Sequence, residues 1–127
     1  MAKLLIVDDE SDVREFAANF FRRRKIDVVT AASGEEALGI VEKQKADLIL
    51  LDITMGGIDG FETLKRIKEL DKDAKVIMVT GKKGDDQGSC DKCRELGAMD
   101  YIHKPLELDE LEKTVLGVLN QEKTGAE

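Results

Sequence analysis

The chain has 127 residues, of which 42% are hydrophobic and 37% are charged, and its formal net charge is −7. This length and balance fit one globular domain with a single core. The acidic charge argues against a general nucleic-acid binder, which would be basic, and no apolar run approaches the roughly 20 residues that span a bilayer.

The N-terminus carries Lys3 and then only four apolar residues before Asp8, which is too short for a secretory signal. We therefore expect a cytoplasmic protein that binds neither nucleic acid nor membrane directly. The expected domain covers residues 1–121, and residues 122–127 are expected to form a flexible C-terminal tail.

Short apolar segments alternate along the chain with stretches of helical periodicity. The predicted strands are Lys3–Val7, Asp27–Ala31, Leu48–Asp52, Lys75–Val79 and Met99–His103. The predicted helices begin at Ser11 or Asp12, at a capping box on Ser33, at Phe61, at Ser89 and near Leu108. The first ends in the basic run Arg22–Lys25, the second near Lys43, the third at Leu70, and the fourth at Leu96 before Gly97.

Each predicted helix has an apolar side that we expect to face the core. Its members are Val13, Phe16, Ala17 and Phe20 in the first helix, Ala37, Leu38 and Val41 in the second, Phe61, Leu64, Ile67 and Leu70 in the third, and Leu108, Leu111, Val115 and Val118 in the last.

This alternation predicts an α/β protein with a parallel sheet between two layers of helices. Right-handed crossovers and the burial of the central strands favour a three-layer, doubly wound (βα)5 fold of the flavodoxin-like kind, with strand order 2-1-3-4-5. The uninterrupted apolar run Leu48–Leu51 is typical of a strand buried on both faces, so it is the predicted centre of the sheet.

Four of the predicted strands lead directly into a polar residue. If the strands are parallel, these polar residues converge on one edge of the sheet, which is where open α/β sheets bind ligands. They are Asp8, Asp9, Asp52, Thr80 and Lys104.

This set of residues has the parts needed for phosphoryl transfer. Clustered carboxylates repel one another, and a hard cation such as Mg²⁺ would compensate them. Lys104 can contact a phosphoryl oxygen, Thr80 offers a hydroxyl donor, and Asp52 can act as a nucleophile that forms an aspartyl-phosphate. Each residue alone has an ordinary structural explanation, and only their shared position at successive strand ends is specific.

From about Lys3 to Leu119 the sequence resembles the receiver domains of two-component response regulators, which are CheY-like in fold. The motifs that carry the resemblance are Val7-Asp8-Asp9-Glu10, Leu51-Asp52-Ile53-Thr54-Met55, Asp59-Gly60, Val79-Thr80-Gly81, Gly97-Ala98 and Tyr101-Ile102-His103-Lys104-Pro105.

The resemblance implies a signalling switch rather than an enzyme with turnover. Asp52 would receive a phosphoryl group from a sensor histidine kinase, a histidine phosphotransfer protein or a small acyl phosphate. Mg²⁺, with Mn²⁺ as an alternative, would be bound by Asp8, Asp9, Asp52 and the backbone carbonyl of Thr54.

The resemblance also assigns contacts and a route for the signal. Lys104 and Thr80 would contact the phosphoryl group, while Thr54 and Lys82 would tune water access to it. Thr80 and Tyr101 would act as the switch pair. The predicted helix Ser89–Leu96, the strand Met99–His103 and the last helix would together form the face for a downstream protein or output domain.

The sequence departs from the family pattern at Gly56, where receivers usually have a proline, and in the glycine-rich start of the fourth helix. Cys90 and Cys93 form a C-x-x-C pair, but two more zinc ligands are not evident, so we interpret them as small packing residues. His103 neighbours Lys104 and is interpreted as structural or exposed.

Two other function classes remain open at this point. The first is a Mg²⁺-dependent phosphohydrolase with an aspartyl nucleophile, which would want a second Asp two residues after Asp52, where Thr54 stands. The second is a flavin carrier of the same fold, for which Asp8, Asp9 and Glu10 would repel the phosphate.

Overall fold

The computed structural model describes the backbone of residues 2–53, 60–80, 94–103 and 107–125, and the side chains of these residues except 80, 103 and 120–125. The elements in chain order are β1 (Lys3–Val7), α1 (Ser11–Arg22), β2 (Asp27–Ala31), α2 (Gly34–Lys43), β3 (Leu48–Asp52), α3 (Gly60–Leu70), β4 (Val76–Thr80), β5 (Asp100–His103) and α5 (Leu108–Gly125).

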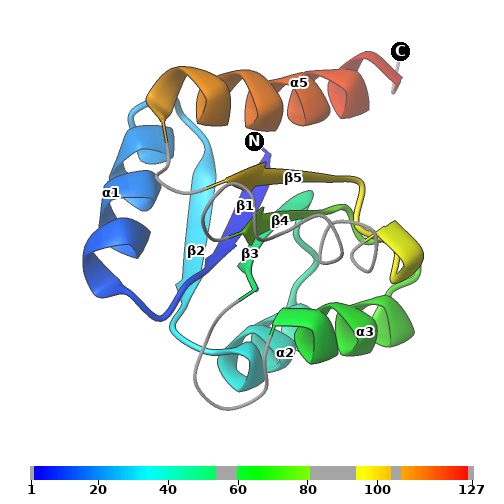
Figure 1. Cartoon of the computed structure of the whole chain (residues 1–127). Helices are drawn as coiled ribbons and strands as arrows, with labels where there is room; N and C mark the ends of the chain where they lie inside the picture. Colours follow the sequence, from blue (N-terminus) through cyan, green and yellow to red (C-terminus); the bar gives the residue numbers. More distant parts are fainter. Residues whose placement is uncertain (1, 54–59, 81–93, 104–106, 126–127) are drawn as a thin grey trace.

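The strands form one parallel sheet in the order β2-β1-β3-β4-β5, which confirms the predicted doubly wound topology. Helices α1 and α5 cover one face of the sheet, and α2 and α3 cover the other (Figure 1). The fold class and strand order follow from the sequence pattern, and β4 and β5 each begin one residue later than predicted.

The core has two layers because the strand side chains alternate between the faces. Ile6 and Leu50 pack with α1 and α5, while Leu5 and Leu51 pack with α2 and α3. All five residues of β3 are buried, as expected for a central strand covered on both sides. Among the described residues, no helix is both long and apolar enough to cross a bilayer.

The N-terminus of α2 is capped as predicted. The Ser33 hydroxyl accepts a hydrogen bond from the Glu36 backbone N–H at 3.1 Å, and the Glu36 carboxylate reaches back to accept from the Ala32 N–H at 3.1 Å. The first bond is the one predicted for a capping box, and it satisfies a donor that the helix start leaves unpaired. The second ends on Ala32, one residue before the N-cap Ser33.

The predicted cap of α1 is wrong. Glu10, not Ser11 or Asp12, occupies the N-cap position, and its side chain makes no capping hydrogen bond. The helix therefore starts one residue earlier than a Ser11 cap would allow and two residues earlier than an Asp12 cap would allow, directly beside the acidic residues that follow β1.

The predicted inward side of α1 is confirmed in part. Ala17 is buried and Phe20 packs against the same cluster, whereas Phe16 is 51% exposed, and Phe21 and Ala18 are buried although they were not predicted. In α2, Ala37 is buried and Leu38 and Val41 pack against its cluster. In α3, Leu64 and Ile67 are buried and Phe61 is partly buried, as predicted, but Leu70 at the end of the helix is exposed. In α5, Leu111, Val115 and Val118 are buried, as predicted, but Leu108 at the start of the helix is exposed.

The chain leaves α1 through a tight turn. Lys25 has φ +63°, its N–H donates to the Arg22 carbonyl at 3.1 Å, and the Ile26 N–H donates to the Phe21 carbonyl at 3.3 Å. This bond pattern with a left-handed residue is a Schellman motif. It turns the chain into β2.

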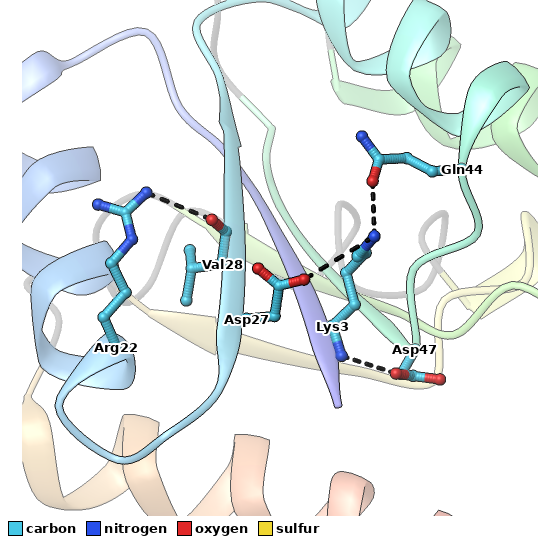
Figure 2. A network of polar contacts seen from close by, with 6 residues as sticks. All are labelled: Lys3, Arg22, Asp27, Val28, Gln44 and Asp47. Carbon is cyan, nitrogen blue, oxygen red and sulfur yellow. Dashed lines mark hydrogen bonds and ion pairs between the residues drawn. The ribbon is translucent and has the colours of Figure 1, made fainter. Parts of the chain in front are cut away.

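The amino edge of the sheet is tied together by polar contacts around Lys3 (Figure 2). The Lys3 backbone N–H donates to Asp47 Oδ2 at 2.7 Å, and its Nζ donates to Gln44 Oε1 at 2.6 Å and lies 3.9 Å from Asp27 Oδ2. Nearby, the Arg22 guanidinium donates to the Val28 carbonyl at 3.3 Å. These contacts join β1, β2, α1 and the chain entering β3.

The predicted helix Ser89–Leu96 lies largely outside the described residues. Its described end is helical at Arg94 and Glu95, and Gly97 follows with φ +104°, which confirms Gly97 as the stop. Helix α5 continues to Gly125, so its backbone includes most of the residues predicted to form a tail.

Candidate functional site

Strand register brings Asp8 and Asp52 next to each other. Val7 of β1 is paired with Leu51 of β3, and each acid is the next residue in its own strand direction. Asp8 is only 3% exposed and Asp52 only 2%. Two carboxylates are therefore held in a largely buried position at the carboxyl edge of the sheet, as the sequence predicts.

The two acids also belong to the same face of the sheet. Leu4 and Ile6 precede Asp8 at alternate positions, and Leu48 and Leu50 precede Asp52 in the same way, and all four pack on the α1 and α5 side. The start of α1 adjoins this position, and the positive end of a helix dipole favours negative charge there.

A third carboxylate completes the cluster. Asp8, Glu10 and Asp52 each place a ligand oxygen so that the three atoms lie within 4.8 Å of one another. The predicted set contained Asp9 in place of Glu10. Asp9 is exposed and does not belong to this group of three in the described part of the chain.

A local turn explains how Glu10 reaches the cluster. The Glu10 N–H donates to Asp8 Oδ1 at 2.9 Å, a side-chain-to-backbone turn that Asp commonly makes two residues ahead. The signal for Glu10 in the sequence was its place two residues after Asp8 in an acidic run, but only the turn geometry identifies it.

Arg14, which no sequence pattern marks as a site residue, also holds the loop. Its guanidinium Nη1 donates to the Asp8 carbonyl oxygen at 2.7 Å. The Asp8 N–H donates to the Ala31 carbonyl of β2 at 3.1 Å. Both backbone groups of Asp8 are thus fixed by hydrogen bonds to other elements.

The exit of β3 is fixed by a close contact with α3. The Ile53 N–H donates to the Val79 carbonyl at 3.0 Å, and the Gly60 N–H donates to the Ile53 carbonyl at 2.8 Å. A Cβ on Gly60 would lie 2.5 Å from the Asp52 carbonyl oxygen and 2.5 Å from Ile53 Cα. Only glycine lets the start of α3 approach the strand end so closely.

The remaining predicted site residues are placed only in part. Val79 is paired with Asp52 and Thr80 with His103, so the backbone of Thr80 ends β4 at the same sheet edge. The side chains of Thr80 and His103, and the residues Thr54, Lys82, Cys90, Cys93 and Lys104, lie outside the described part of the structure.

Tyr101 lies on the opposite face from Asp52. Its ring is half-buried and packs against the α2 and α3 layer, which includes Leu96. The Arg94 guanidinium carbon lies 5.4 Å from the ring centroid, within the range of a cation–π contact. The ring therefore contacts the described end of the predicted helix Ser89–Leu96, as the sequence predicts.

The carboxylate cluster fits a hard divalent cation. Oxygen-only ligands of like charge, two of them buried, repel one another in a medium where charge is poorly screened. Mg²⁺ is typically held by one or two carboxylates together with waters and phosphate oxygens. The site can therefore bring a metal and a phosphoryl group to Asp52.

Comparison with known proteins matches residues 4–116 to the response regulator receiver domain. Sporulation initiation phosphotransferase F of Bacillus subtilis is 38% identical over 116 residues, which are 89% of this chain and 90% of that protein. Heme response regulator HssR of Staphylococcus aureus is 37% identical over 123 residues, 95% of this chain, and the matched part spans 53% of HssR.

Solved structures agree with these relatives. A two-component response regulator from Clostridium difficile superposes with a TM-score of 0.89 at 29% identity, covering 96% of this chain and 98% of that one. A response regulator of Thermotoga maritima, solved in complex with Mg(2+)-BeF, has a TM-score of 0.82 at 33% identity, covering 93% and 99%.

Proposed function

The chain belongs to the response regulator receiver domain family of two-component signalling, and from that premise we propose that Asp52 is its phosphoacceptor. The observation that carries the proposal is the cluster itself. Asp52 ends the central strand, is 2% exposed, and has the carboxylate oxygens of Asp8 and Glu10 within 4.8 Å. A lone helix-capping Asp would not need such neighbours.

In the proposed reaction a carboxylate oxygen of Asp52 attacks the phosphorus of the donor. A new O–P bond forms, and the bond between phosphorus and the leaving group of the donor breaks. When the donor is a phosphohistidine, the leaving group is the imidazole nitrogen. Lys104 and Thr80 are the proposed contacts to the phosphoryl oxygens, with Thr54 and Lys82 beside them.

We propose Mg²⁺ as the metal, with Mn²⁺ as a substitute, and Asp8, Asp9, Asp52 and the Thr54 carbonyl as its ligands. When bound, the metal neutralises the charge that gathers on the carboxylates and the phosphoryl oxygens. Asp9 stays in the proposed set because the resemblance assigns the second acid of the Asp8-Asp9 pair. Glu10 is the competing ligand, since its carboxylate lies in the cluster.

The proposed partners follow from the family. A sensor histidine kinase or a histidine phosphotransfer protein supplies the phosphoryl group, and a protein target or output domain reads the face formed by the predicted helix Ser89–Leu96, β5 and α5. The domain acts as a switch, with no chemistry beyond gain and loss of its own phosphoryl group. The cytoplasmic location expected from the sequence stays a prediction.

The test is incubation with Mg²⁺ and a small acyl phosphate, followed by intact-mass measurement and peptide mapping. We expect one added phosphoryl group on Asp52, released by hydroxylamine as acyl phosphates are. Asp52→Asn should abolish it. The matched control is Asp47→Asn, which removes an exposed carboxylate at the other edge of the sheet and should leave the reaction intact. Modification at another residue would contradict the proposal.

A further inference from the structure

We propose that Arg14 is a positioning residue that holds the acidic loop Asp8–Glu10 in its metal-binding shape. The inference rests on the proposed function, because it concerns the same site. It adds a residue that does not touch metal or phosphate and acts only through the backbone of the residues that do.

Arg14 contacts both loop residues of the cluster. Its guanidinium Nη1 donates to the Asp8 carbonyl oxygen at 2.7 Å, and its backbone N–H donates to the Glu10 carbonyl oxygen at 3.0 Å. Glu10 in turn donates its N–H to Asp8 Oδ1 at 2.9 Å. These bonds close a ring through Asp8, Glu10 and the second turn of α1.

This ring of hydrogen bonds is important because α1 has no side-chain hydrogen bond from its N-cap residue to hold its first turn. Its N-cap, Glu10, makes no side-chain capping bond, and the Glu10 carboxylate lies in the cluster instead. Arg14 is half-buried, so its bond to a carbonyl is shielded in part from competing water. The positive charge of the guanidinium also offsets some of the repulsion among the three acids.

The two possible roles of Arg14, a positive charge beside the site and a positioning contact, predict opposite effects of its removal on Mg²⁺ affinity. A positive charge beside the site repels Mg²⁺, so if charge were all that Arg14 supplied, removing it would tighten binding. If Arg14 positions the ligands, removing it weakens binding. We infer that positioning dominates, because salt and solvent screen the charge of a half-exposed side chain, whereas a displaced ligand is lost at any salt concentration.

The experiment measures Mg²⁺ affinity by calorimetry, together with the melting temperature without metal. Arg14→Met keeps the length of the side chain but removes its charge and donors, and Arg14→Lys keeps the charge. We expect Arg14→Met to weaken Mg²⁺ binding roughly tenfold, the lower end of what outer partners of metal ligands contribute. Arg14→Lys should recover part of the loss, and high salt should leave the difference in place.

Arg22→Met is the matched control. Arg22 also lies in α1, and its guanidinium donates a hydrogen bond to the backbone carbonyl of Val28. This contact lies at the amino edge of the sheet (Figure 2). Its variant should lower the melting temperature about as much as Arg14→Met while leaving Mg²⁺ affinity unchanged. A fall in affinity that merely followed the loss of stability would appear in both variants and would overturn the inference.

A metal-independent readout separates this inference from the proposed function. Exchange of the Glu10 N–H with solvent, followed by NMR without Mg²⁺, should speed up in Arg14→Met and stay unchanged in Arg22→Met. Unchanged or tighter Mg²⁺ binding in Arg14→Met would overturn the positioning role. Failure of the unsubstituted protein to bind Mg²⁺ would instead overturn the proposed function, and unchanged Glu10 exchange would still overturn the role of Arg14.

Discussion

At the scale of single residues, Asp8 and Asp52 are buried carboxylates held next to each other by strand register. At the 4.8 Å limit of the cluster, the repulsion between two like charges amounts to about 0.9 kcal/mol at an effective dielectric constant of about 80 and to about 3.5 kcal/mol at about 20. This repulsion opposes folding, and a bound cation would relieve it.

Asp8→Asn should therefore raise the free energy of unfolding measured in the absence of divalent metal, by about 1 kcal/mol or more. The Asn oxygen can still accept the Glu10 N–H, so the turn is kept. Urea unfolding with and without Mg²⁺ is the measurement, and the stabilisation by Mg²⁺ should largely disappear. Asp47→Asn, which likewise keeps an acceptor for a backbone N–H, should change neither quantity much.

A second prediction decides between Asp9 and Glu10 as metal ligands. Mg²⁺ stabilises the native state because it binds the folded site and not the unfolded chain. Asp9→Asn should remove most of the rise in melting temperature that millimolar Mg²⁺ produces, and Glu10→Gln should remove less. The reverse order would identify the cluster of Asp8, Glu10 and Asp52 as the ligand set and exclude Asp9 from it.

At the scale of elements, the junction between β3 and α3 depends on Gly60. A Cβ there would meet backbone atoms of Asp52 and Ile53 at 2.5 Å, and backbone cannot move aside as a flexible side chain can. The backbone of Asp52, the proposed phosphoacceptor, is thus in direct contact with the start of α3.

Gly60→Ala should destabilise the protein by roughly 1–3 kcal/mol, the usual cost of overpacking, and should slow phosphorylation because the carbonyl of Asp52 must shift. Gly39→Ala is the control, because a Cβ there meets nothing within 4 Å. Alanine in a helix interior is more favourable than glycine by about 1 kcal/mol, so this variant should be slightly more stable than the unsubstituted protein. Denaturant unfolding of both variants, with the rate of acyl-phosphate labelling, tests the prediction. Equal stabilities would refute it.

The order and approximate bounds of the helices and strands were largely predictable from the sequence, but which residues of α1 face the core was not. Runs such as Leu48–Leu51 and the capping box at Ser33 depend on local patterns, and both are confirmed. In α1 the prediction failed at Phe16 and missed Phe21, because Phe16, Phe20 and Phe21 fit two neighbouring helical stripes equally well. Phe21 is buried in the cluster that the sheet forms with α1 and α5, and only this packing decides between the two stripes.

The site shows the same division. Asp8 and Asp52 were predictable because strand ends in a parallel sheet share an edge. Glu10 and Arg14 were not, because their roles depend on a turn and on the reach of a long side chain, which leave no periodic signal.

At the scale of the whole molecule, the proposed signal must cross the sheet. Asp52 lies on the α1 and α5 side, whereas Tyr101 packs on the α2 and α3 side, and β4 lies between their strands. Thr80 ends β4 beside β5. A phosphoryl group can change the far face only if it favours one of two states through different contacts in each.

Thr80→Ala should still bind a phosphoryl mimic such as beryllofluoride with Mg²⁺, but the amide resonances of β5 should shift much less than in the unsubstituted protein. Two-dimensional NMR measures this, with Thr30→Ala in β2 as a matched control far from β5. Equal shifts in both variants and the unsubstituted protein would show that the Thr80–Tyr101 pair is not the route.

The polar ties around Lys3 lie at the edge of the sheet opposite the acids, about 16 Å away for strands of this length. Substitutions that break these contacts are expected to lower the stability of the fold, and with it the amount of folded protein in a cell, while leaving the acidic cluster unchanged. Natural selection can therefore adjust the abundance of the domain and its signalling by separate mutations. A lineage in which Asp47 or Gln44 is replaced by a residue without a hydrogen-bond acceptor is expected to keep its partner and its phosphorylation while its steady-state level falls.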